Sequence, residues 1–137
     1  MSGRYRFEAA AGHRQDESLV RVDFNRAKQI EKVRYGSQYI FYPTDLYTWL
    51  YIYYKDIVWA YRRQGDIFGK LGTTGGNMNL NNLMIVTRDK KRIGIPVEEM
   101  ENVLKGLDII HERNAFVDIG FTRQKELSYL GQVPRMS

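Results

Sequence analysis

The stretch from Val33 to Arg63 constrains the fold more than any other part of the sequence. It holds eight of the ten tyrosines and both tryptophans. Aromatic and β-branched side chains favour the pleated, half-buried surface of a β-sheet. Turn-forming residues interrupt the stretch at Gly36-Ser37 and at Pro43-Thr44-Asp45. The stretch therefore predicts three or four consecutive antiparallel strands, a meander.

The strands predicted within this stretch are residues 33–35, 39–42, 46–53 and 57–61. Successive side chains of a strand point to opposite faces of its sheet. In residues 46–53, one face carries Tyr47, Trp49, Tyr51 and Tyr53, and the other carries Leu46, Thr48, Leu50 and Ile52. Two interpretations of the aromatic face stay open. It is either exposed for recognition or buried against a helix with only its hydroxyl groups in water.

The flanking segments contain weaker patterns. Residues 1–25 form an N-terminal extension in which Leu19–Phe24 alternates and predicts one edge strand. Asn25 is a typical helix N-cap, which predicts a short helical turn over residues 26–32. Residues 78–87 and 92–95 predict a second hairpin around the charged turn at residues 88–91.

The strongest helical pattern lies at about residues 96–113. Pro96 suits the first turn of a helix, and apolar side chains recur at spacings of three and four. These apolar residues are Val97, Met100, Val103, Leu104, Leu107 and Ile110. Ala115–Phe121 predicts a short strand, and Thr122–Leu130 a last helical turn.

The glycine-rich segment at residues 64–77 differs from a phosphate-binding loop. Three residues rather than four separate Gly65 from Gly69-Lys70, and Leu71 stands where Ser or Thr would coordinate magnesium. The segment is therefore predicted to be a mobile hairpin connection.

Length and composition indicate one soluble domain. The chain has 137 residues, 43% hydrophobic and 27% charged, and no cysteine. No apolar run is long enough for a transmembrane helix, and the N-terminus lacks the apolar core of a secretory signal. We expect a cytoplasmic location.

The net charge of +5 is concentrated in one part of the sequence. Residues 62–92 contain seven Lys and Arg but only Asp66 and Asp89 as acids, whereas the chain beyond residue 92 has more acidic than basic residues. This distribution fits either an anionic partner or ordinary solubilising charge on exposed loops.

Several segments between residues 33 and 121 resemble a family of small uncharacterised bacterial proteins with a pleckstrin-homology-like (PH-like) domain. The similar segments are Arg34-Tyr35-Gly36, residues 39–42, residues 55–63, residues 83–91, the helix and Asp118-Ile119-Gly120-Phe121. The resemblance implies an α+β fold: an antiparallel meander or barrel of about six to seven strands, capped by one amphipathic C-terminal helix. It implies a PH-like domain at residues 26–121 and a C-terminal tail at 122–137. Only Lys32 and Arg34 lie near the first strand-to-strand loop, so binding of a phosphoinositide lipid is not expected.

No pattern indicates an enzyme or a cofactor. The two histidines, His13 and His111, are far apart in sequence, and no metal-ligand spacing is present. Ser18, Ser37 and Ser128 lack the setting of a catalytic nucleophile. We therefore predict no catalytic residue, no metal and no cofactor.

Three functions remain, and an interaction module that binds another protein is favoured. The alternatives are nucleic-acid binding, through aromatic stacking and basic loops, and self-association as a structural protein or homodimer. The candidate interaction surface consists of Tyr47, Trp49, Tyr51, Tyr53, Arg62, Arg63, Lys90, Lys91 and Arg92.

Overall fold

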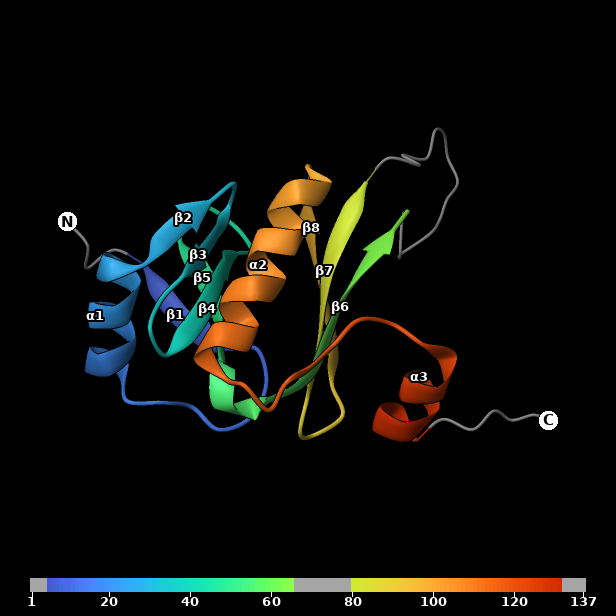
Figure 1. The fold of residues 1–137 in the computed structure, drawn as a ribbon. Helices are drawn as coiled ribbons and strands as arrows, with labels where there is room; N and C mark the ends of the chain where they lie inside the picture. Colours follow the sequence, from blue (N-terminus) through green and yellow to red (C-terminus); the bar gives the residue numbers. More distant parts are fainter. Residues whose placement is uncertain (1–4, 66–79, 132–137) are drawn as a thin grey trace.

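The computed structural model describes residues 5–65 and 80–131 of the chain. Within these ranges, nine strands form two open sheets, and three helices pack on them (Figure 1). The predicted α+β class and its C-terminal amphipathic helix are confirmed. The predicted barrel is wrong, because the 3₁₀ turn Tyr54–Asp56 ends one sheet and the chain enters a second sheet that does not pair with the first.

Sheet A is built from the first part of the aromatic stretch and the segments before it. Strands β2 to β5 form an antiparallel meander, and β1 adds at the edge, parallel to β5. In spatial order the strands are β1 (Arg6–Ala9), β5 (Thr48–Tyr53), β4 (Tyr39–Pro43), β3 (Val33–Tyr35) and β2 (Lys28–Ile30).

Sheet B contains the second predicted hairpin. In spatial order its strands are β8 (Arg92–Val97), β7 (Asn81–Thr87), β6 (Ile57–Gln64) and β9 (Asp118–Ile119). Strand β9 lies parallel to β6, so part of the predicted strand at 115–121 is confirmed. Most of the glycine-rich connection falls in residues 66–79, outside the described residues.

Helix α1 (Glu17–Arg26) occupies the segment where an edge strand was predicted at residues 19–24, and that prediction is wrong. Asp16 starts the helix, since its Oδ1 accepts hydrogen bonds from the Ser18 amide at 2.9 Å and the Ser18 hydroxyl at 2.7 Å. The buried side chains follow at helical spacing: Val20, Asp23 and Phe24. The apolar pattern of residues 19–24 is compatible with a strand or a helix, and the N-cap at Asp16 favours the helix.

Two further boundaries differ from the prediction. The helical turn expected at residues 26–32 is instead β2 and its turn to β3, where Glu31 has a φ of +57°. Helix α2 (Met100–Arg113) begins four residues later than predicted, because Pro96 lies in β8. As β8 is at the edge of sheet B, a proline there is tolerated.

The last predicted helical turn is confirmed as α3 (Arg123–Leu130), capped by the Thr122 hydroxyl.

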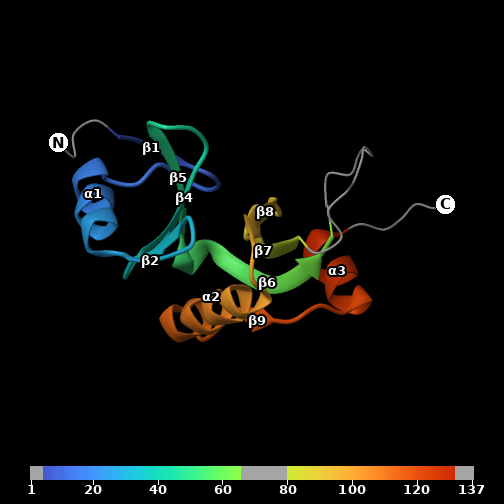
Figure 2. The ribbon, with the colours of Figure 1, turned by 90° about the horizontal axis from the view of Figure 1, so that it is seen from above.

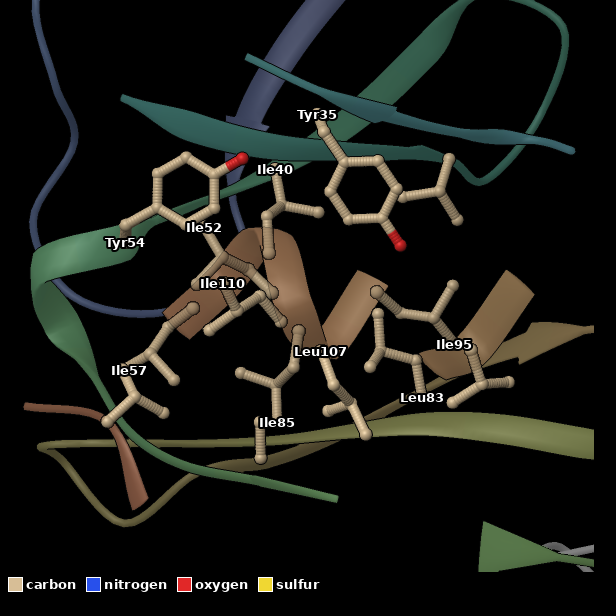
Figure 3. Close-up of a cluster of buried hydrophobic side chains, with 14 of the residues drawn as sticks. Tyr35, Ile40, Ile52, Tyr54, Ile57, Leu83, Ile85, Ile95, Leu107 and Ile110 are labelled. Atoms are coloured by element: carbon tan, nitrogen blue, oxygen red, sulfur yellow. The ribbon is translucent and has the colours of Figure 1, made fainter. Parts of the chain in front are cut away.

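Helix α2 lies alongside both sheets and closes the main core between them (Figure 2). Figure 3 shows aliphatic side chains from sheet A, sheet B and α2 converging in this core. Gly106 allows close packing, because a Cβ at this position would collide with the Tyr35 hydroxyl. The core residues labelled in Figure 3 are Tyr35, Ile40, Ile52, Tyr54, Ile57, Leu83, Ile85, Ile95, Leu107 and Ile110.

The outer face of each sheet is covered by its own helix. Helix α1 covers sheet A over an aromatic cluster of Phe7, Phe24, Tyr39, Phe41, Trp49 and Tyr51, together with Val20. Helix α3 covers sheet B over Trp59, Tyr61, Met84 and Val86. These two helices lie at opposite ends of the molecule (Figure 2). None of the described helices has the length and apolar character needed to cross a bilayer.

Glu31 connects the β2–β3 turn to the start of α2. Its Oε1 accepts the Glu98 amide at 2.7 Å, and its Oε2 accepts the Glu99 amide at 3.0 Å and the Asn102 side chain at 2.7 Å. A carboxylate at this position satisfies free amides and complements the positive end of the helix dipole. Burial alone would raise the pKa of Glu31, but these three hydrogen bonds outweigh it and hold the pKa below its ordinary value.

We expect Glu31→Gln to lower the free energy of unfolding by about 1 kcal/mol at pH 7. Because the folded-state pKa of Glu31 is lowered, its stabilisation is complete above the ordinary value of 4.5 and is lost as the pH falls through the lower folded value. Urea titrations at several pH values measure this difference. The exposed Glu99→Gln is the control, with little expected change. A Glu31→Gln deficit that persists below both pKa values would contradict the assignment.

Candidate functional site

The aromatic residues of the predicted interaction surface do not form an open face. Trp49 is 8% exposed and Tyr51 is 2% exposed. Phe24 of α1 packs edge-on against Trp49, with ring centroids 4.9 Å apart. The interpretation of a sheet face buried against a helix is confirmed, and the exposed-face alternative is wrong, because α1 covers this side. Tyr53 is half-buried, and Tyr47 is exposed in the β4–β5 turn.

The predicted basic residues lie at two ends of sheet B. Arg62 and Arg63 are at the end of β6, opposite Leu83 and Asn82. Lys90, Lys91 and Arg92 are at the other end of the hairpin, in and after the β7–β8 turn. Lys91 Nζ donates to the Ala10 carbonyl at 2.9 Å, and Arg92 Nη1 forms an ion pair with Glu126 at 3.0 Å. The nine predicted residues therefore do not make one surface.

A different set of residues surrounds an open hollow of about 620 Å³, which we call the basic hollow. It lies where the 3₁₀ turn, the end of β7, the C-terminus of α2 and helix α3 meet. The connection from α2 to α3 crosses this end of β6 (Figure 1). The lining residues are Lys55, Ile57, Val58, Arg88, Arg113, Asn114, Ala115, Phe116 and Tyr129.

A tight turn after α2 displays Phe116 at the hollow. Asn114 Oδ1 accepts the Phe116 amide at 3.1 Å, and the Asn114 carbonyl accepts the Val117 amide at 3.1 Å. Asn114 Nδ2 in turn donates to the Tyr54 carbonyl at 3.0 Å, which ties the turn to the 3₁₀ segment. Val117 is buried in the main core, whereas the side chain of Phe116 is 94% exposed. The turn is therefore anchored on both sides of a phenylalanine that contributes almost no burial to the fold.

Backbone carbonyls hold two of the cations of the hollow. Arg88 Nη2 and Nε donate to the Lys55 carbonyl at 2.8 and 3.1 Å. Arg113 Nε donates to the Gly36 carbonyl at 3.3 Å. The third cation, Lys55 Nζ, makes no hydrogen bond or ion pair with any described residue. Two guanidinium groups are thus oriented beside a free ammonium group.

Helix α3 contributes the far wall of the hollow through Tyr129. The Tyr129 hydroxyl donates to Asp118 Oδ2 at 2.9 Å, and Lys125 Nζ pairs with Asp118 Oδ1 at 2.8 Å. The hydrogen bond to the Asp118 carboxylate raises the pKa of Tyr129. The Lys125 contact, followed by Tyr129, lowers the pKa of Asp118. Asp118 is therefore engaged with α3 and does not balance the cations of the hollow.

A second groove of about 450 Å³ lies between α1 and the end of sheet A. Exposed Leu19 and Val22 line it beside Tyr53, with Asp23 and Arg26 as its charged groups. Its charges balance, so this groove offers no electrostatic preference for a ligand. The basic hollow is the more specific candidate.

The described residues contain no group of three or more His, Cys, Asp or Glu side chains that could hold a metal ion. His13 and His111 are both exposed. The basic hollow presents three cations, apolar walls and an exposed aromatic ring.

A protein-family model with the description "Domain of unknown function (DUF6709)" matches residues 13–129. The chain belongs to the DUF6709 family. The DUF6709 segment includes every lining residue of the basic hollow and leaves β1 outside. No curated protein and no solved structure matches the chain.

Sequence reasoning missed most of the hollow because its residues lie far apart in the chain. Lys55, Arg88 and Arg113 lie in three separate segments. Two of these positions carried a signal: Lys55 lies between the predicted strands 46–53 and 57–61, and Arg113 lies at the end of the helix predicted at about 96–113. Phe116 had been assigned to the strand predicted at residues 115–121. It lies instead in a turn that the Asn114 side chain closes by accepting the Phe116 amide.

Proposed function

We propose that this chain is a non-enzymatic interaction module that binds another protein at the basic hollow. The observation that carries the proposal is Phe116, a large apolar side chain that a hydrogen-bonded turn holds in solvent. Scattered exposed apolar residues are common on protein surfaces. Phe116 differs because it stands at the edge of a concave site whose walls include Ile57, Val58 and Tyr129. Partially apolar concave sites with a few polar groups are typical binding sites.

The biological setting is part of the proposal. The resemblance to PH-like domains supports a bacterial origin, and the absence of cysteine fits the reducing cytoplasm. The PH-like relationship itself rests on the similar segments at 33–121 and on the C-terminal helix. The two open sheets depart from the barrel of that fold.

Site-specific photo-crosslinking tests the binding site. A benzophenone amino acid replaces Phe116 in the full chain, and Tyr47, which is exposed in the β4–β5 turn, is the matched control position. We expect one discrete protein adduct from position 116 and none from position 47. Excess unlabelled wild-type chain should suppress the adduct, and excess Phe116→Ser chain should compete at least about tenfold less well, since the loss of a buried aromatic anchor commonly exceeds 1 kcal/mol.

Two outcomes would contradict the proposal. Equal competition by wild type and Phe116→Ser would show that the ring makes no contribution. An adduct at twice the chain mass of 16.1 kDa would indicate self-association instead. Light scattering over a concentration series would then establish the oligomeric state of the free chain.

A further inference from the structure

The residues that line the basic hollow carry an excess of positive charge. Lys55, Arg88 and Arg113 line the hollow, and no Asp or Glu is among its described lining residues. Outside the lining, Asp56 Oδ1 forms a long ion pair with Arg88 Nε at 3.9 Å, which offsets part of this charge. A concave site with one sign of charge concentrates ligands of the opposite sign.

The hydrogen bonds of the two arginines leave that charge in place. The acceptors of these hydrogen bonds are neutral: the carbonyl oxygens of Lys55 and Gly36 and, for Arg113, also the Tyr54 hydroxyl. These bonds fix the orientation of each guanidinium group, and among the described residues Arg88 Nη1 has no partner. A guanidinium group presents several donors to a carboxylate in a planar arrangement. The arginines are therefore preorganised for an oxyanion, which reduces the entropy lost on binding.

The apolar walls favour a protein segment over a nucleic acid. Val58, Ala115 and Phe116 supply carbon surface between the cations. Nucleic-acid interfaces are more polar and follow the phosphate backbone along a continuous positive track. A hollow with three cations around an apolar floor matches a short peptide that carries carboxylates next to an aromatic or aliphatic side chain.

From this arrangement we infer that the occupant of the basic hollow is an acidic segment of the partner protein. Its carboxylates contact Lys55, Arg88 and Arg113, and an apolar side chain packs on Phe116. This inference rests on the proposed function, since it specifies the chemistry of the partner at the same site.

Fluorescence anisotropy with defined probes tests the inference. The main probe is a fluorescein-labelled short peptide of Asp and Glu with one central Phe. The other probes are the same peptide with Ala in place of Phe and a fluorescein-labelled oligothymidylate of equal charge. At low salt, we expect the Phe peptide to bind several-fold more tightly than the Ala peptide and more tightly than the oligothymidylate.

Lys55→Glu and Lys32→Glu form a matched pair of variants. Both lysines are exposed in turns, and their side chains make no hydrogen bond or ion pair with a described residue. Both variants should therefore fold, and each changes the net charge equally. Lys32 follows Glu31 near the start of α2, away from the hollow. We expect Lys55→Glu to weaken binding of the Phe peptide about tenfold, because it replaces an attraction by a repulsion, and Lys32→Glu to change it less than about twofold. Arg88→Glu provides a second variant, with its melting temperature measured in parallel.

Equal losses in Lys55→Glu and Lys32→Glu would show an effect of net charge alone and overturn the inference. Tighter binding of the oligothymidylate, competing with the Phe peptide, would assign the hollow to nucleic acid and also overturn it. The proposed function can survive either result. If the crosslink at position 116 persists in Lys55→Glu and competition by Phe116→Ser stays weak, a protein partner binds there without needing acidic groups.

Discussion

Asp23→Ala is expected to lower the free energy of unfolding by about 3 to 4 kcal/mol, because it removes the acceptor for several backbone amides in one buried place. Asp23 Oδ1 accepts the Ser37 amide at 2.7 Å. Asp23 Oδ2 accepts the Gln38 and Tyr39 amides, each at 3.0 Å. The side chain is 7% exposed, so water cannot replace all three bonds. The amide of the buried Tyr39 is left without an acceptor and accounts for the largest share of the loss.

Asp45→Ala is the matched control for Asp23→Ala. Asp45 Oδ1 accepts the Tyr47 and Thr48 amides, each at 2.8 Å, in the exposed β4–β5 turn. Water can take over as acceptor there, so a much smaller loss is expected. Chemical denaturation of both variants measures the difference. Similar losses of unfolding free energy in the two variants would show that burial of the amides bound by Asp23 does not matter, and the explanation would be wrong.

The same contact explains the glycine at position 36. A Cβ at this position would collide with Asp23 Oδ2. The sequence pattern identified Gly36-Ser37 as a turn, which is confirmed between β3 and β4. It gave no sign that an aspartate of α1 occupies the space that a side chain would need. The turn could be predicted locally, whereas its anchor depends on a helix that the prediction had made a strand.

Predictions that rested on neighbouring residues were confirmed more often than those that rested on distant ones. The meander β3–β4–β5 and the apolar stripe of α2 follow from alternation and helical spacing. The edge strands of the two sheets depend on the parallel pairs β1–β5 and β6–β9, which join segments far apart in sequence. Turn and periodicity signals carry no information about such pairs.

The functional surface shows the same limitation more strongly. Aromatic residues on one strand face indicated a surface, but periodicity cannot tell a solvent-exposed face from one covered by a helix. Trp49 and Tyr51 are covered because α1 packs over them. The basic hollow is assembled from Lys55, Arg88 and Arg113, whose convergence depends on the tertiary fold. Local composition placed the positive charge in residues 62–92, and only Arg88 of the three lies in that segment.

Trp59→Ala is expected to lower the free energy of unfolding by about 3 to 5 kcal/mol, in the range for removing a buried aromatic side chain. The Trp59 side chain is completely buried. Its ring stacks on Tyr129 of α3 with centroids 5.4 Å apart and on Phe121 with centroids 5.9 Å apart. Its indole Nε1 donates to the Gly120 carbonyl at 2.7 Å. Trp59→Phe keeps an aromatic ring and loses this hydrogen bond, so about 1 to 2 kcal/mol is expected.

Trp59→Ala should loosen helix α3 before it affects the rest of the fold. No side chain of α3 is itself fully buried, so the helix depends on its contacts with Trp59, Asp118 and Arg92. We expect faster amide hydrogen exchange in α3 of the Trp59→Ala variant, with α1 unchanged at the opposite end of the molecule.

Tyr129 also forms a wall of the basic hollow. Loosening of α3 should therefore weaken binding of the acidic Phe peptide even though Trp59 does not line the hollow. Unchanged exchange in α3 together with unchanged peptide binding would show that Trp59 stabilises sheet B alone.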